Sequence, residues 1–195
     1  SDAPEPCVNG TYSDVPGLEN CPLCPAGHYC ETRTEVTGIC PLNNYCQAGT
    51  MVPRPCETGY YTQHEAATEC EMCPAGYYCE TSATSTNITL CPQGHYCPQL
   101  STVARECPAG TYSGSEGQSQ LSDCLPCTPG YYCDQSALAE PTGSCLAGFY
   151  CTDSAETATP VNQSFGDQCP AGKYCPAGAV EPLPCPAGTY NNMVQ

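Results

Sequence analysis

Tryptophan is absent from this 195-residue chain, phenylalanine occurs twice, and Leu, Ile, Val and Phe together number only 22. A chain with so few large apolar side chains cannot bury the area that offsets the conformational entropy of an ordinary globular domain. No run of 18 apolar residues occurs either, so we expect no membrane span in this segment. An ordinary globular core is therefore excluded, and the chain needs another source of stability.

Basic residues are scarce as well, since four Lys and Arg stand against 20 Asp and Glu, a formal net charge of −16. Without cations to neutralise phosphate, nucleic acid is excluded as a partner. The acidic residues are scattered singly, which favours the solvation of an exposed surface. Weak calcium binding between modules is the alternative, and no EF-hand-like spacing supports it.

Side-chain sets for catalysis are missing too. His28 and His95 occupy a position where Thr, Tyr or Lys serve equally, and His64 stands alone. Three Cys-x-x-Cys pairs have the spacing of a zinc knuckle, but 21 cysteines and three glycosylation sequons favour disulfides instead. We therefore expect no enzyme activity, no cofactor and no metal site.

Cysteine and tyrosine are abundant, with 21 and 14 residues, and they recur in the template Cys-x-x-Gly-x-Tyr. Tyr is present in all eleven copies, and Gly is present in all but one, where Asn43 replaces it. Successive copies are 16 to 24 residues apart, a period typical of many small units that contact mainly their neighbours. The copies start at Cys7, Cys24, Cys40, Cys56, Cys73, Cys91, Cys107, Cys127, Cys145, Cys169 and Cys185.

The template occurs in a closed form and an open form. Seven closed copies have a second Cys directly after the Tyr, whereas the open copies at Cys7, Cys56, Cys107 and Cys185 have Ser, Thr or Asn there. Each open copy begins a larger unit, and closed copies fill the unit. The predicted division is a linker or the end of a preceding unit at 1–6, unit 1 at 7–55, unit 2 at 56–106, an expanded unit 3 at 107–184, and the start of a further unit at 185–195.

The template glycine is interpreted as a turn residue, because Asn, which replaces it at Asn43, tolerates the left-handed backbone best after Gly. The spacers between copies have neither a helical period nor long alternation. We therefore predict a small disulfide-rich fold, an extended tandem array of short β-hairpin and loop modules with almost no helix. Positive φ is expected at Gly27, Gly59, Gly76, Gly94, Gly110, Gly130, Gly148, Gly172 and Asn43.

The residue before the template Tyr varies from copy to copy. In extended backbone its side chain points opposite to the Tyr, whose ring can bury on the order of 150–200 Å² beside a disulfide and a proline. Rings that recur on the variable side indicate contacts between chains, because monomers seldom expose such a row. The alternative is that each ring packs on its own spacer. The interface candidates are Tyr60, Tyr77, Tyr131 and Phe149.

Cysteine parity bears on the pairing. The units contain 6, 6 and 8 cysteines, so Cys185 is left over; its partner is expected beyond Gln195, and a free thiol is the alternative. Pairing each template Cys with the next Cys accommodates the extra closed copy of unit 3, and so does a ladder shifted by one cysteine. A crossed scheme does not extend simply. Each bond would contribute roughly 2–3 kcal/mol. The first ladder comprises Cys7–Cys21, Cys24–Cys30, Cys40–Cys46, Cys56–Cys70, Cys73–Cys79, Cys91–Cys97, Cys107–Cys124, Cys127–Cys133, Cys145–Cys151 and Cys169–Cys175.

The run Cys-Pro-Ala-Gly-Thr-Tyr-Ser at 107–113, followed by Cys124-x-x-Cys127, resembles the ephrin-receptor-like cysteine-rich repeat, also called the GCC repeat. It is similar too to tumour-necrosis-factor-receptor and growth-factor-receptor cysteine-rich modules. In the ephrin-receptor-like family the first Cys closes on the Cys about 14 residues later, which supports the unshifted ladder. The tumour-necrosis-factor-receptor branch crosses its later cysteines, so the crossed scheme stays open. The resemblance implies an extracellular spacer or binding module and does not name a partner.

Cysteine abundance indicates an oxidising compartment, and three sequons agree with a secreted or cell-surface location. We expect a structural protein, an acidic glycosylated rod that builds a fibre, coat or surface appendage. Its partners would be other copies of itself or related cysteine-rich chains. A receptor or adhesion ectodomain that binds a protein ligand is the alternative, with unit 3 as its atypical part. The sequons for N-linked glycans are at Asn9, Asn87 and Asn162.

Overall fold

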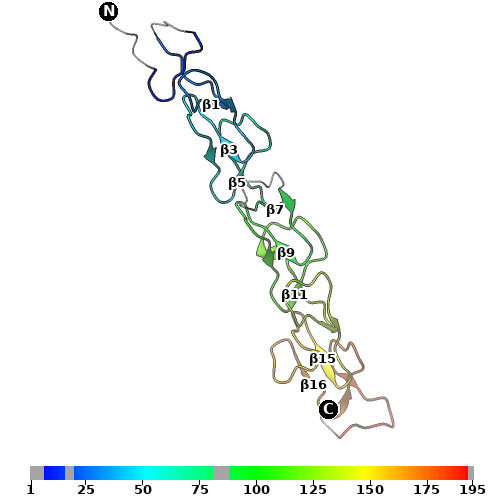
Figure 1. Cartoon of the computed structure of the whole chain (residues 1–195). Coiled ribbons are helices and arrows are strands. Elements are labelled where there is room, and N and C mark those ends of the chain that lie inside the picture. Colours follow the sequence, from blue (N-terminus) through cyan, green and yellow to red (C-terminus); the bar gives the residue numbers. More distant parts are fainter. Residues whose placement is uncertain (1–6, 16–19, 81–87, 193–195) are drawn as a thin grey trace, which may run out of the picture. The chain divides into compact units, whose positions relative to one another are not determined.

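The computed structural model describes residues 7–15, 20–80 and 88–192. It contains two compact units, one made of Ser1–Pro74, Tyr78–Thr89 and Gln99–Val103 and the other of Ala75–Tyr77, Leu90–Pro98 and Ala104–Gln195. Within the described ranges nearly all regular structure is short strand (Figure 1). The single helical element there is the 3₁₀ turn η1, Leu121–Asp123. The predicted fold class, small disulfide-stapled hairpins in tandem with almost no helix, is confirmed.

Eighteen short strands form nine two-stranded antiparallel hairpins in the described chain. The strands are β1 His28–Tyr29, β2 Gly38–Ile39, β3 Asn44–Tyr45, β4 Arg54–Pro55, β5 Tyr60–Tyr61, β6 Glu71–Met72, β7 Tyr77–Tyr78, β8 Thr89–Leu90, β9 His95–Tyr96, β10 Arg105–Glu106, β11 Thr111–Tyr112, β12 Leu125–Pro126, β13 Tyr131–Tyr132, β14 Gly143–Ser144, β15 Phe149–Cys151, β16 Gly166–Gln168, β17 Lys173–Tyr174 and β18 Leu183–Pro184.

Each hairpin follows one rule that the template sets. The first strand holds the variable residue and the template Tyr, and the second holds the two residues before the next template Cys; β15 and β16 are each one residue longer. In the first unit β1 pairs with β2 so that His28 lies opposite Ile39. In the second unit β13 pairs with β14 so that Tyr131 lies opposite Ser144. The next template Cys closes the hairpin, as when the Cys145 N–H donates to the Gly130 carbonyl at 3.0 Å.

The template turn has the predicted backbone. All the glycines for which positive φ was expected have φ between 74° and 89°, and Asn43 has φ of 57°. This prediction is confirmed. The left-handed residue turns the chain between the template Cys and the Tyr, which brings the Cys and its closed partner together across six residues.

Successive copies are joined by a recurring set of backbone hydrogen bonds. For the copies at Cys127 and Cys145, the Gly130 N–H donates to the Cys151 carbonyl at 2.9 Å and the Cys133 N–H to the Ala155 carbonyl at 2.8 Å. The Ser154 N–H returns to the Cys127 carbonyl at 3.1 Å. These bonds pair the backbone groups around buried cysteines, so the copies need no wide sheet to satisfy them.

The same set recurs in the first unit, between the copies at Cys24 and Cys40. The Gly27 N–H donates to the Cys46 carbonyl at 2.8 Å, the Cys30 N–H to the Thr50 carbonyl at 3.0 Å, and the Gly49 N–H to the Cys24 carbonyl at 2.8 Å. Open copies keep this arrangement. In the open copy at Cys107, Ser113 replaces the second cysteine of a closed copy, and its carbonyl accepts from the Gly94 N–H. Each unit is therefore a chain of interlocked copies.

A second left-handed turn, which the sequence reasoning missed, follows the Tyr in each of seven spacers. The residues at this turn have no common chemistry, so no fixed letter marks them. Their carbonyls approach the template glycine two copies earlier: a Cβ added at Gly130 would lie 2.5 Å from the Gly178 carbonyl oxygen, and one at Gly27 would lie 2.6 Å from that of Ala66. The turn residues are Gly49, Ala66, Leu100, Gly117, Ala137, Ser154 and Gly178.

Two template tyrosines of the second unit pack on the disulfide of the next copy. Half-buried Tyr132 lies against the buried cluster of Cys145, Cys151 and Ala155. Tyr150 lies in the same way against the cluster that contains the next disulfide. The clusters are small, as the shortage of large apolar side chains predicts, and disulfide sulfur provides much of their apolar surface.

Tyr132→Ala is expected to lower the stability of the second unit by about 2 kcal/mol, because it removes a half-buried ring from a disulfide cluster. Tyr190→Ala is the matched control: the same template position is 84% exposed there, and the change should alter stability by less than about 0.5 kcal/mol. Hydrogen exchange of the Cys145 and Cys151 amides measures the difference. Equal effects of the two substitutions would show that the ring does not stabilise the cluster.

Candidate binding surfaces

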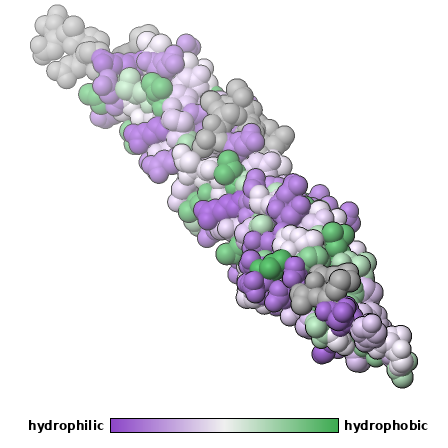
Figure 2. All heavy atoms as spheres, turned by 90° about the horizontal axis from the view of Figure 1, so that it is seen from below, coloured by the Kyte–Doolittle hydropathy of each residue, from purple (hydrophilic) through white to green (hydrophobic). Residues whose placement is uncertain are grey.

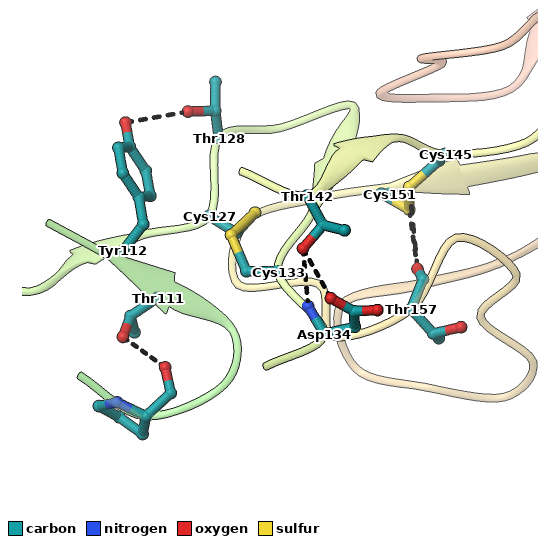
Figure 3. The surroundings of a disulfide bond; sticks show 11 residues. Thr111, Tyr112, Cys127, Thr128, Cys133, Asp134, Thr142, Cys145, Cys151 and Thr157 are labelled. Carbon is teal, nitrogen blue, oxygen red and sulfur yellow. Dashed lines mark hydrogen bonds between the residues drawn. A yellow bond between two sulfur atoms is a disulfide. The ribbon is translucent and has the colours of Figure 1, made fainter. Parts of the chain in front are cut away.

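Ten disulfides are formed, each between a template Cys and the next Cys, with Cα–Cα distances of 5.7 to 6.3 Å. This is the nearest-neighbour ladder, and the shifted and crossed schemes left open by the sequence do not occur. Figure 3 shows Cys127–Cys133 together with the neighbouring closed pair. Cys185 is half-buried and has no disulfide partner in the structure. The ladder holds each hairpin but supplies no reactive group at the surface.

Titratable groups do not gather into a chemical centre in the described residues, where no cluster of three or more His, Cys, Asp or Glu could hold a metal ion. The Ser119 backbone N–H, 2.9 Å from the Asp123 carboxylate, lowers the pKa of that group, and Gln120 lowers it further while burial opposes both. The Asn162 backbone N–H lowers the pKa of Asp167 in the same way, and the Gln168 backbone N–H lowers it further. Both carboxylates cap turns.

Other hydroxyl and carboxylate side chains of the second unit make hydrogen bonds between residues close to one another in the fold. In Figure 3 the Tyr112 hydroxyl lies 3.3 Å from that of Thr128 in the next copy, and the Thr142 hydroxyl donates to the Asp134 carboxylate at 2.6 Å. The Thr157 carbonyl faces the sulfurs of the Cys145–Cys151 pair. These contacts are local and structural.

The variable position lies opposite the residue before the next template Cys, so the two side chains share one face of the hairpin. In the first unit half-buried Tyr60 faces Met72, which is 50% exposed. In the second unit Tyr131 is 46% exposed, whereas Tyr77 and Phe149 are half-buried. Each hairpin thus displays one variable pair, and its fixed Tyr points the other way.

Exposed apolar residues elsewhere are dispersed. Figure 2 shows hydrophobic residues in small groups between hydrophilic ones on the face drawn. Single exposed apolar residues are ordinary in proteins, and only contiguous patches indicate a partner. Any apolar binding surface is therefore local to one hairpin pair or one groove.

Two of the predicted glycosylation sites can be placed, and Asn87 lies outside the described residues. Asn9 and Asn162 are both exposed. Asn162 has φ of 54° and lies in the loop that expands the copy at Cys145. Its N–H donates to the Asp167 carboxylate at 3.0 Å, and the neighbouring Gln163 bridges to Gly166. Asn162 therefore stands on a tight, solvent-facing turn.

A groove of about 500 Å³ lies in the first unit, lined by residues 9–10 and 49–55. A smaller cavity of about 150 Å³ lies among residues 62–64, 67–69 and Glu71. The sequence reasoning missed the larger groove, although Met-Val-Pro-Arg-Pro at 51–55 is an apolar exception among the spacers. The repeat template describes only the residues that the copies share, so it does not mark a spacer that differs from the others.

The comparison with known proteins supports a cysteine-repeat chain. No family model matches the sequence. A stretch of 73 residues, 36% of this chain, is 36% identical to Cysteine repeat modular protein A of Toxoplasma gondii. The match spans only 2% of the length of that relative. It agrees with cysteine-rich repeats and does not name the ephrin-receptor-like class, which stays a resemblance. In the described residues no helix is long and apolar enough to cross a lipid bilayer.

Proposed function

We propose that this chain is a non-enzymatic extracellular structural protein, an acidic glycosylated repeat that builds a fibre, coat or surface appendage through contacts between chains. One observation carries the proposal: the template Cys, Gly and Tyr are used in the same structural way in copy after copy, while each hairpin displays a variable outward pair. A scaffold that repeats its inner parts and varies its outer ones suits repeated contacts with neighbouring chains.

The best candidates for these contacts are the pairs that expose aromatic or sulfur-containing side chains. Tyr and Met are enriched in interface cores, and the Tyr60–Met72 pair presents both on one hairpin face. Tyr131 adds an exposed ring in the second unit. The partners are other copies of this chain or related cysteine-rich chains. With a net charge of −16, such copies repel one another, so added salt should promote their association.

The alternative is a receptor or adhesion ectodomain, and one observation favours it. The copy at Cys145 is expanded by a loop in which the Thr152 N–H donates to the Phe165 carbonyl at 2.8 Å, and no other copy has a step of 24 residues. An ordered, atypical loop on a repeating scaffold is a place where a protein ligand is recognised.

Sedimentation velocity of the oxidised chain over a range of protein and salt concentrations tests the proposal. We expect association that grows with both, and its loss in the double variant Tyr60→Ser/Met72→Ser and in Tyr131→Ser. Thr111→Ser, which changes an already small side chain at the same variable position, is the matched control and should associate normally. A monomer under all conditions would overturn the structural proposal and favour the receptor alternative.

A further inference from the structure

We infer that the groove formed by residues 9–10 and 49–55 is the seat of the N-glycan on Asn9, whose first sugars cover its apolar wall. The inference deepens the proposed function, since it rests on the glycosylation proposed there. Asn9 is both a sequon asparagine and a lining residue of the groove. A sugar attached to it therefore begins beside the groove.

The Asn9 side chain is already held in place. The Arg33 guanidinium donates to its Oδ1 at 2.9 Å, and Nδ2, the atom that carries an N-glycan, makes no hydrogen bond to the described residues. Glycan transfer forms a bond from C1 of an N-acetylhexosamine to Nδ2 and breaks the C1–O bond to a lipid diphosphate donor. The lipid diphosphate and the Nδ2 proton leave. The Oδ1 contact survives this reaction.

The groove walls match the chemistry of an N-acetylhexosamine. Val52 is 64% exposed, and Met51 and the flanking prolines continue the apolar wall, against which an acetyl methyl and the C–H face of a sugar ring can pack. A volume of about 500 Å³ lies in the range of sites that enclose drug-sized molecules, the size of the first two sugars.

Arg54 supplies the polar partner. It lines the groove, and its guanidinium makes no hydrogen bond or ion pair with the described residues. Its five N–H donors suit the acetamide carbonyl and ring hydroxyls of a sugar. Asn162 offers the contrast within the same chain: it is exposed on a turn and lines neither the groove nor the smaller cavity.

Methionine oxidation reports on the groove directly. The whole chain is expressed in a host that attaches N-glycans, and mass spectrometry measures occupancy at Asn9 and Asn162. Dilute peroxide then oxidises Met51, in the groove, and Met72, which is 50% exposed away from it. We expect Met51 to oxidise several-fold more slowly in the glycosylated chain than in Asn9→Gln, with Met72 unchanged. Asn162→Gln should leave both rates as they are.

Enzymatic release of the glycan from the folded chain repeats the comparison in a protein that has already folded with its native Asn9. Release should speed the oxidation of Met51 and leave that of Met72 unchanged. An occupied Asn9 with an unprotected Met51 would overturn the seat and leave the groove to another occupant, such as an acidic peptide facing Arg54. An unoccupied Asn9 would overturn the glycan itself, and with it that part of the proposed function.

Discussion

Gly130→Ala is expected to lower the stability of the second unit by about 3 kcal/mol, and Gly178→Ala by only about 1 kcal/mol. Both residues have positive φ, 84° and 76°, so both substitutions strain the backbone. Only the first also forces a Cβ to within 2.5 Å of a carbonyl oxygen, whereas the nearest atoms to a Cβ at Gly178 are 3.8 Å away. The pair therefore separates the cost of close packing from that of conformation.

The chain itself contains the control for Gly178. Ala137 and Ser154 occupy the equivalent spacer turn with φ of 60° and 59°, so a Cβ is accommodated there. Hydrogen exchange of the Cys145 and Cys151 amides reports on the local stability around this contact. Equal losses from Gly130→Ala and Gly178→Ala would mean that the approach between alternate copies imposes no constraint of its own.

The template predicted the fold class because its constraints are local. A cysteine six residues from its partner and a left-handed glycine between them fix a hairpin almost by themselves. Asn43, the one departure from Gly, identified the backbone conformation, and its φ of 57° agrees. Local constraints of this kind can be read from residue types.

The sequence pattern did not predict the contacts between alternate copies. The spacer turn holds Gly49, Ala66 or Leu100 alike, because its carbonyl oxygen is the atom that comes nearest the template glycine. A backbone carbonyl is common to every residue, so no letter marks it. The three-unit division of the sequence likewise stays a prediction, since the interlocking bonds are alike in open and closed copies.

The surfaces were only partly predictable for a related reason. The outward direction of the variable position follows from strand alternation, and the observed pairing of Tyr60 with Met72 agrees with it. How far each ring is covered depends on the spacer beside it, which the template does not describe. The groove beside Asn9 arises where the template turn of one copy meets the spacer of another, and only three-dimensional packing brings them together.

Removing the Cys145–Cys151 disulfide is expected to destabilise the second unit by about 4 kcal/mol, more than removal of Cys7–Cys21 destabilises the first. Chain entropy alone predicts the reverse, because it assigns about 2 kcal/mol to a loop of 6 residues and about 3 kcal/mol to one of 14. The difference should come from packing. Tyr132 and Ala155 lie against the Cys145–Cys151 pair, and removing its sulfurs takes away about 2 kcal/mol of packing free energy.

The experiment compares the double variants Cys145→Ala/Cys151→Ala and Cys7→Ala/Cys21→Ala by hydrogen exchange in each unit, with peptide mapping under non-reducing conditions to check the remaining nine bonds. Cys145 and Cys151 are fully buried, whereas Cys7 is 9% exposed and Cys21 is half-buried, so the Cys7–Cys21 bond has less packing to lose. A larger loss for Cys7–Cys21 would show that loop closure dominates and that the tyrosines contribute little. Recovery of Cys127 joined to Cys145 in the unmodified chain would instead replace the ladder with a crossed scheme, and the packing argument would fall with it.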